Sequence, residues 1–102
     1  MEATYMLCRN RVADYDAWKL HFDSFRQAQR AAGLELLHLC REMEDPSNVF
    51  FLFEIRSVEE ARAFLNAAEN REAGKRAGVL ESELHYLAGD EALERHEVGQ
   101  PR

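Results

Sequence analysis

The chain has 102 residues, of which 46% are hydrophobic and 31% are charged, a balance that is typical of a globular protein and too apolar for an intrinsically disordered one. Its 19 acidic and 13 basic side chains give a formal net charge of -6, which repels nucleic-acid backbones and anionic membrane surfaces. We therefore expect neither nucleic acid nor a membrane as a partner. Because the sequence shows no signal-peptide pattern and no long apolar run, we expect a cytoplasmic protein.

The first two expected elements are a strand and a helix. Residues 4–12 (TYMLCRNRV) alternate between apolar and polar side chains and predict a half-buried strand. The next stretch predicts one helix over residues 16–32, because its apolar side chains recur at steps of three and four. Asp14 or Asp16 should cap this helix, and Gly33 should end it. The buried stripe of the helix comprises Trp18, Phe22, Phe25 and Ala32, with Ala28 and Gln29 between them.

The middle of the chain predicts a hairpin. Residues 34–43 and 49–56 are strand-like, and residues 44–48 (EDPSN) have the composition of a turn, since proline presets φ and Asp, Ser and Asn bond their own backbone. The second of these strands, VFFLFEIR, is rich in aromatic and β-branched residues. It therefore predicts a central strand that is covered on both faces.

A second helix and a last strand follow. Ser57 should cap the helix, with Glu60 completing a capping box. The helix should break within residues 66–70 and stop at Gly78. Residues 81–87 alternate again and predict the fourth strand.

This order of elements is the split βαβ pattern of a ferredoxin-like α+β fold. It predicts a four-stranded antiparallel sheet in the order 4-1-3-2 with both helices on one face, within a domain of residues 1–88 that is followed by a polar tail of residues 89–102. Cys8 and Cys40 would then be separated by the third strand, too far apart for a disulfide. We expect both to be small buried hydrophobic residues.

Three segments of the chain resemble a known family: NRVADYDAWKLHFDSF, CREMEDPSNVFFLFEIRSVEEARAFL and REAGKRAGV. Over residues 4–87 the sequence resembles the dimeric α+β barrel proteins of the antibiotic biosynthesis monooxygenase-like superfamily. The resemblance implies a homodimer in which two sheets pack face to face, and a ligand cavity between each sheet and its own helices. Members of the superfamily include cofactor-independent polyketide oxygenases and haem-degrading enzymes.

A comparison with the haem-degrading members argues against haem degradation. Their strand asparagine matches Asn10, but their tryptophan falls at Ile55 and their helix histidine falls near Gly74. The oxygenase members use a pocket set of Asn, Trp, Arg, Tyr or His. This chain keeps the asparagine and carries its only tryptophan, Trp18, on the first helix.

Asn10 is the first candidate catalytic residue. It shares a strand face with Cys8 and Val12, because side chains two residues apart point the same way. If that face looks toward the helices, the carboxamide could orient a substrate carbonyl or enolate with both a donor and an acceptor. The alternative is an asparagine that is hydrogen-bonded at a strand end.

Two strand histidines are the other catalytic candidates. By alternation, His38 should share a face with Leu36 and Cys40, and His85 lies in the fourth strand. In a pocket of low dielectric constant, an imidazole could serve as the general base for a phenol or an acidic C–H group. The alternative for each is a histidine that is hydrogen-bonded within the sheet.

The candidate ligand-binding residues are largely aromatic. Trp18, Phe22 and Phe51 would form the wall of a pocket for a planar ligand, or would belong to the plain core. His21 borders the helix stripe and could cover the pocket mouth. No pair of histidines has the spacing of a metal site and no nucleotide-binding motif is present, so we expect no metal and no cofactor.

Two functions remain open at this point. A non-catalytic or regulatory protein that binds a small molecule, such as an aromatic one, is favoured, because no complete catalytic set can be assembled. The alternative is a cofactor-independent monooxygenase that acts on a small aromatic or polyketide-like substrate. In either case the apolar face of the sheet predicts a homodimer that buries at least about 1,200 Å², with Phe50 or Phe51 near its centre.

Overall fold

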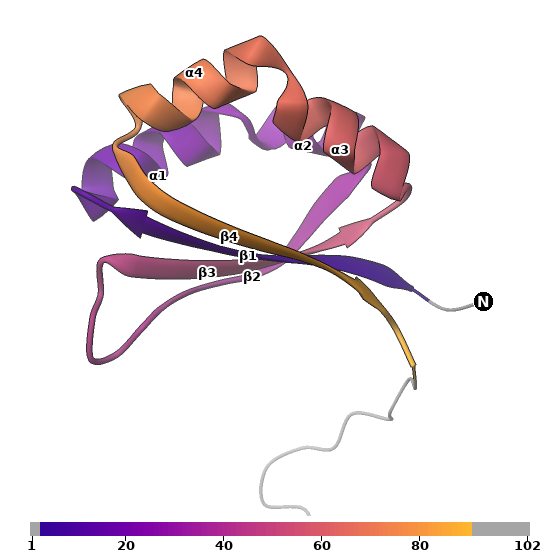
Figure 1. The fold of residues 1–102 in the computed structure, drawn as a ribbon, viewed down its shortest axis with the longest axis horizontal. Coiled ribbons are helices and arrows are strands. Elements are labelled where there is room, and N and C mark those ends of the chain that lie inside the picture. The colour runs from indigo at the N-terminus through magenta and orange to yellow at the C-terminus, as the bar shows by residue number, and fades with distance from the viewer. Residues whose placement is uncertain (1–2, 91–102) are drawn as a thin grey trace, which may run out of the picture.

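In the computed structural model, which describes residues 3–90, helices cover one face of a four-stranded antiparallel sheet (Figure 1). The elements are β1 (Thr4–Val12), α1 (Tyr15–Ser24), α2 (Arg26–Ala31), β2 (Leu34–Arg41), β3 (Asn48–Ile55), α3 (Val58–Asn66), α4 (Ala68–Arg76) and β4 (Val79–Ala88). The strand order β2-β3-β1-β4 confirms the expected 4-1-3-2 topology and the ferredoxin-like α+β fold. Residues 91–102, most of the expected tail, lie outside the described residues, and the domain boundary stays a prediction.

Side-chain caps fix where α1 and α3 begin. Asp14 caps α1, since its Oδ1 accepts a hydrogen bond from the Ala17 backbone N–H at 3.2 Å. Ser57 caps α3 in the same way, with its Oγ 3.2 Å from the Glu60 backbone nitrogen. The capping box is only half formed, because the Glu60 carboxylate pairs with Arg56 instead.

Glycines fix where the helices end. Gly33 and Gly78 have φ of 83° and 81°, a left-handed conformation that is costly for any residue with a Cβ atom. At Gly33 the space is closed as well, since a Cβ there would lie 2.8 Å from the Cβ of Arg56. The chain therefore passes from α2 into β2 at Gly33, and from α4 into β4 at Gly78, through a backbone conformation that favours glycine.

The expectation of one continuous first helix is wrong, because the helix breaks at Phe25. The Ser24 hydroxyl donates to the His21 carbonyl at 2.6 Å, the oxygen that would accept the Phe25 N–H in a regular α-helix. The Phe25 N–H instead bonds to the Phe22 carbonyl at 3.1 Å. The second expected helix breaks at Ala67, between α3 and α4, inside the expected range 66–70.

The strand β3 is buried on one face of this chain and not on both. Its burial alternates along the strand, so that Phe51 and Phe53 are buried while Phe50 is 36% exposed. Neighbouring strand ends also differ from the expected ones: β2 stops at Arg41, and β4 begins at Val79, where it pairs with Val12. The expected cover on both faces would need a second molecule.

A register shift in β2 turns His38 away from the helices. Leu36 pairs with Phe53, whereas His38 pairs with Leu52, so that Leu37 is an extra residue in the ladder. Leu36 therefore points to the helix side and His38 to the open side. The expectation that these two residues share a face is wrong, because simple alternation does not hold across the shift.

The cysteines are both free, as expected. Cys8 pairs with Phe51 and Cys40 pairs with Phe50, so the whole of β3 separates them. Cys8 is 5% exposed, but Cys40 is exposed on the open face of an edge strand, which corrects the expectation that both are buried. Among residues 3–90, no helix is long and apolar enough to cross a membrane.

Candidate functional site

A cavity of about 470 Å³ lies between the sheet and the helices. This volume is within the range of about 300–1,000 Å³ that is typical of small-molecule sites. Strands β1, β3 and β4 form its floor together with the first residue of β2, Leu34, and all four helices contribute to its cover. The two layers that enclose it are seen edge-on in Figure 1.

Aromatic rings form one wall of the cavity. Trp18 and Phe22 of α1 stack with ring centroids 4.8 Å apart, and Phe51 meets Phe22 edge-on at 5.1 Å. Phe53 continues this wall along β3, 5.8 Å from Phe51. These rings belong to the hydrophobic core and line the cavity at the same time. The expected location of Trp18, Phe22 and Phe51 is therefore found, and their role in binding stays a prediction.

Asn10 lies on the cavity side of β1. It pairs across the sheet with Val49 and Ser82, and it shares its face with the buried residues Cys8 and Val12. Asn10 and Ser82 both line the cavity. The expected face is therefore correct, and the carboxamide is placed where it could orient a ligand.

Gln29 is a cavity residue that the sequence analysis did not single out. It is 6% exposed, it lines the cavity from α2, and its Oε1 is buried without a hydrogen-bond partner among residues 3–90. Its signal in the sequence is its position, four residues after Phe25 in the apolar stripe of the first helix layer.

The four candidate imidazole and amide groups do not come together. Among the expected residues, His21 lines the cavity while remaining partly exposed, which agrees with a position at its mouth. His38 pairs with Leu52 and His85 pairs with Leu7, on the opposite face of the sheet, and neither lines the cavity. This placement corrects the hypothesis that either strand histidine acts as a base inside the pocket of its own chain.

The Cys8 thiol lines the cavity but is not a nucleophile. Burial raises the pKa of Cys8 to about 12, because the thiolate would lose its hydration. The thiol therefore stays protonated at neutral pH, and only the thiolate is reactive. Cys8 contributes an apolar surface to the floor.

The cavity has free space in front of α4. A Cβ atom added at Gly74 would meet nothing within 4 Å, although Gly74 lines the cavity. This is the position near which the histidine of the haem-degrading proteins falls. Ile55, the position of their tryptophan, is 5% exposed in the core and does not line the cavity.

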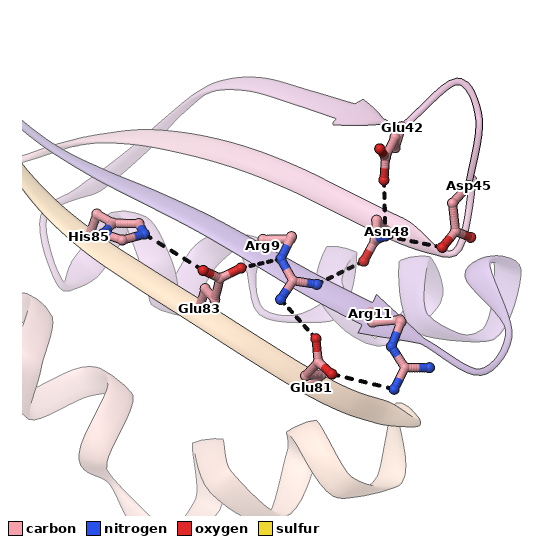
Figure 2. Close-up of polar contacts among 8 residues, drawn as sticks. All are labelled: Arg9, Arg11, Glu42, Asp45, Asn48, Glu81, Glu83 and His85. Atoms are coloured by element: carbon pink, nitrogen blue, oxygen red, sulfur yellow. Dashed lines mark hydrogen bonds and ion pairs between the residues drawn. The ribbon is translucent and has the colours of Figure 1, made fainter.

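A cluster of charged residues occupies the other face of the sheet (Figure 2). Arg9 of β1 binds Glu81 and Asn48, each at 2.8 Å, and also binds Glu83. The hydrogen bond from Arg9 lowers the pKa of Glu81, with the positive charge of Arg11 adding to the effect. The cluster ties β1 to β3 and β4, and we interpret it as structural.

Together the sheet order, the helices on one face and the cavity between the layers define a ferredoxin-like α+β protein with an internal pocket. Solved structures share this fold, among them a "putative antibiotic biosynthesis monooxygenase" from Bordetella bronchiseptica. That structure has 16% sequence identity and a TM-score of 0.71 over 91% of this chain and 100% of its own.

Two further structures are similar. A "putative antibiotic biosynthesis monooxygenase" from Caulobacter crescentus CB15 has 14% identity and a TM-score of 0.69, over 88% of this chain and 92% of its own. A dimeric ferredoxin-like protein from an uncultured marine organism has 14% identity and a TM-score of 0.62, over 94% of this chain and 95% of its own. The fold implied by the sequence resemblance is thereby confirmed. No family model matches the chain, and no curated protein matches it by sequence.

Proposed function

We propose that the protein binds a small, planar, largely apolar molecule between its sheet and its helices, in a non-catalytic or regulatory role. The observation that carries this proposal is the aromatic-walled cavity of about 470 Å³, whose lining also includes the amide Asn10 and the cationic side chains Arg71 and Lys75. Stacking on aromatic rings contributes about 0.5–1.5 kcal/mol beyond the burial of area. A few polar groups in such a pocket fix the orientation of the ligand.

The chemistry of the lining favours binding over catalysis. The Cys8 thiol is protonated, and the histidines of β2 and β4 lie on the other face of the sheet. In the described part of the chain, His21 is the imidazole that lines the cavity. The described lining thus combines one imidazole and one orienting amide, Asn10, with the cationic side chains Arg71 and Lys75 of α4, and its thiol is unreactive.

Tryptophan fluorescence offers a direct test. Trp18 is the only tryptophan of the chain and is 2% exposed in the cavity wall, so a bound aromatic ligand should change its emission. We would titrate the protein with two- and three-ring aromatic compounds, beginning with 1-naphthol. In the variant Gly74→Phe the new ring would occupy free space in the cavity, and binding should be lost.

The matched control is Gly74→Ala, which adds a single carbon to the same position and should bind as the wild type does. Circular dichroism and thermal melting would establish that both variants fold. Absence of any saturable change in Trp18 emission with the whole series would contradict the proposal. Equal binding by the wild type and by Gly74→Phe would place the ligand elsewhere.

The second part of the proposal is a homodimer that forms through the open face of the sheet. Leu7, Phe50 and Leu52 lie at the middle of that face, and Phe50 is 36% exposed. Phe51 faces the cavity, so Phe50 is the phenylalanine that would lie near the centre of the interface. The marine structure of the same fold is described as dimeric, which supports this assembly. Light scattering should give about twice the chain mass of 11.8 kDa.

A cofactor-independent monooxygenase is the second candidate function. Its support is that Asn10 lines the cavity and that several structures with this fold are described as putative antibiotic biosynthesis monooxygenases. Oxygen uptake with anthrone and quinol substrates tests it. Uptake that is lost in Asn10→Ala would support it, and no uptake, or uptake that no cavity substitution affects, would exclude it.

A further inference from the structure

We infer that the molecule in the cavity carries a carboxylate on its planar aromatic body and that Arg71 and Lys75 of α4 recognise it, an inference that rests on the proposed binding function. Both residues line the cavity, and both are exposed. They therefore lie where the lining meets solvent, and their charged groups are carried on long side chains. Cations at the opening of an apolar cavity point to an anion on the part of the ligand that stays near water.

The charge of the cavity lining differs in sign from that of the whole chain, which has a net charge of -6. Among the Asp, Glu, Lys and Arg residues of the described part of the chain, Arg71, Lys75 and Glu83 line the cavity. Arg9 binds the Glu83 carboxylate on the open face of the sheet (Figure 2). Within residues 3–90 the lining therefore offers two cationic side chains and no free carboxylate.

The two cations of α4 are poorly neutralised by their own chain. Arg71 forms no ion pair among residues 3–90. The Lys75 Nζ is 3.7 Å from the Glu72 Oε1, and the two side chains are 77% and 59% exposed, so water screens this contact. Because Arg71 and Lys75 are four residues apart on one helix, their side chains are neighbours and their like charges repel. An anion held between them would offset this repulsion.

Free space lies beside these cations. Gly74 is three residues after Arg71, on the same side of α4, and it also lines the cavity. A Cβ atom added at Gly74 would meet nothing within 4 Å. A ligand can therefore approach the helix there, with its rings on the aromatic wall and its anionic group against α4.

The chemistry of the two side chains defines the class of anion. A guanidinium group donates two parallel hydrogen bonds to a carboxylate, and an ammonium group adds a compact positive charge. A single negative charge is favoured over a doubly charged phosphate, because the rest of the lining is largely apolar and each charge that leaves water loses its hydration. The cavity should therefore bind an aromatic carboxylate more tightly than its neutral amide.

Three probes with the same ring system test the inference: 1-naphthoate, 1-naphthamide and 1-naphthylmethylammonium. At neutral pH the first is an anion, the second is neutral and the third is a cation. We expect the wild type to bind 1-naphthoate roughly tenfold more tightly than 1-naphthamide, the effect of one charge-assisted hydrogen bond, and to bind the cation most weakly. Trp18 emission reports the dissociation constant of each probe.

Arg71→Gln and Lys75→Gln should each reduce the preference for 1-naphthoate, and the double variant should abolish it. The affinity for 1-naphthamide should stay unchanged in all three, a result that a loss of structure would not give. Arg76→Gln is the matched control, because it removes the same charge from the last turn of α4 at a position outside the described cavity lining. It should keep the preference of the wild type. Thermal melting shows whether each variant is folded.

The outcomes separate the two proposals. If the wild type binds 1-naphthoate and 1-naphthamide equally, or if the double variant keeps the preference, the role of the α4 cations is overturned while the binding pocket stands. An equal loss in Arg76→Gln would attribute the preference to the net charge of the helix and would also overturn the inference. Tighter binding of 1-naphthyl phosphate than of 1-naphthoate would show that the assigned class of anion is wrong. If no aromatic probe binds to the wild type, the proposed function fails and this inference fails with it.

Discussion

The two faces of the sheet present different chemistry, although the same strands build both. The covered face holds aromatic rings and neutral amides, including Phe51, Phe53 and Asn10. The open face has apolar side chains at its middle and charged residues toward one end, where Arg9 binds its acidic partners (Figure 2). Consecutive residues of β3 therefore contribute to two surfaces, the cavity between sheet and helices and the open face of the sheet, for which we propose a small molecule and a second copy of the chain.

The two faces should contribute differently to the stability of the chain and to the affinity between chains. Ion pairs among exposed side chains contribute little, because water and salt screen them. The charged end of the open face should therefore affect partner orientation more than affinity. The apolar middle of the open face and the aromatic wall of the covered face should dominate, and substitutions in β3 can separate them.

The largest expected effect comes from comparing Phe53→Ala with Phe50→Ala. Phe53 is 2% exposed, so its truncation should lower the free energy of unfolding by about 3–5 kcal/mol at every protein concentration. Phe50→Ala should act through the dimer, so its effect should grow with protein concentration. Urea denaturation at several concentrations measures both. The proposed difference between the faces would be contradicted if the losses in unfolding free energy of the two variants depended on protein concentration in the same way.

Alkaline pH should weaken the covered face through Cys8. The folded-state pKa of this thiol is about 12, while the same thiol in the unfolded chain ionises near its ordinary value of 9.0. Unfolding therefore releases a proton between these pH values. The free energy of unfolding should be unaffected below pH 9 and should fall by about 1.4 kcal/mol per pH unit above it, until pH 12.

Unfolding curves between pH 8 and pH 11 measure this slope. Cys8→Ala should flatten it, whereas Cys40→Ala should leave it unchanged, since Cys40 is exposed. A slope that is the same in the wild type and in both variants would show that another group causes the alkaline loss.

A charge on the open face should separate the subunits without unfolding them. Leu52→Asp places a carboxylate at the apolar middle of that face, and we expect the dimer to weaken by roughly thirtyfold or more, the scale of a central contact. Light scattering over a dilution series measures the shift from twice the chain mass to the chain mass. Leu20→Asp, at a helix position that is 75% exposed, is the control. A wild-type monomer at micromolar concentration would contradict the assembly.

The smallest expected effects come from two glycines of the covered layer. Gly74→Ala should raise the free energy of unfolding by about 1 kcal/mol, because Gly74 lies inside α4 and an added Cβ meets open space. Gly78→Ala should lower it by about 1–2 kcal/mol, because φ there is 81°. Thermal melts compare them. Changes of the same sign would refute this assignment of roles.

Much of the fold could be predicted from local signals. The caps at Asp14 and Ser57, the glycines at the helix ends and the short turn between β2 and β3 are all visible in the sequence, and together they leave few topologies. The break at Phe25 could not be predicted from periodicity, because the apolar spacing continues across it; a hydrogen bond from the Ser24 hydroxyl to the His21 carbonyl accompanies the break. Helix propensity does not indicate such a bond.

The candidate site was less predictable than the fold. Asn10 and the aromatic wall follow from alternation and helical spacing, which the structure preserves in β1 and α1. Gln29 was visible as a position in a buried stripe, but its unpaired oxygen depends on the surrounding three-dimensional packing. His38 was misplaced because alternation was extended through a register shift that the sequence does not mark.

The register shift in β2 changes the face of the sheet on which each later residue of the strand lies. Successive side chains of a strand point to alternate faces of the sheet. Because Leu37 is an extra residue in the ladder, every later side chain of β2 lies on the face opposite to the one that simple alternation predicts. The His38 imidazole therefore lies outside the pocket because the strand contains one extra residue before it, and not because of the residue types in the strand. Without that extra residue, His38 and Cys40 would point to the helix side of the sheet, and Leu39 would point to its open face.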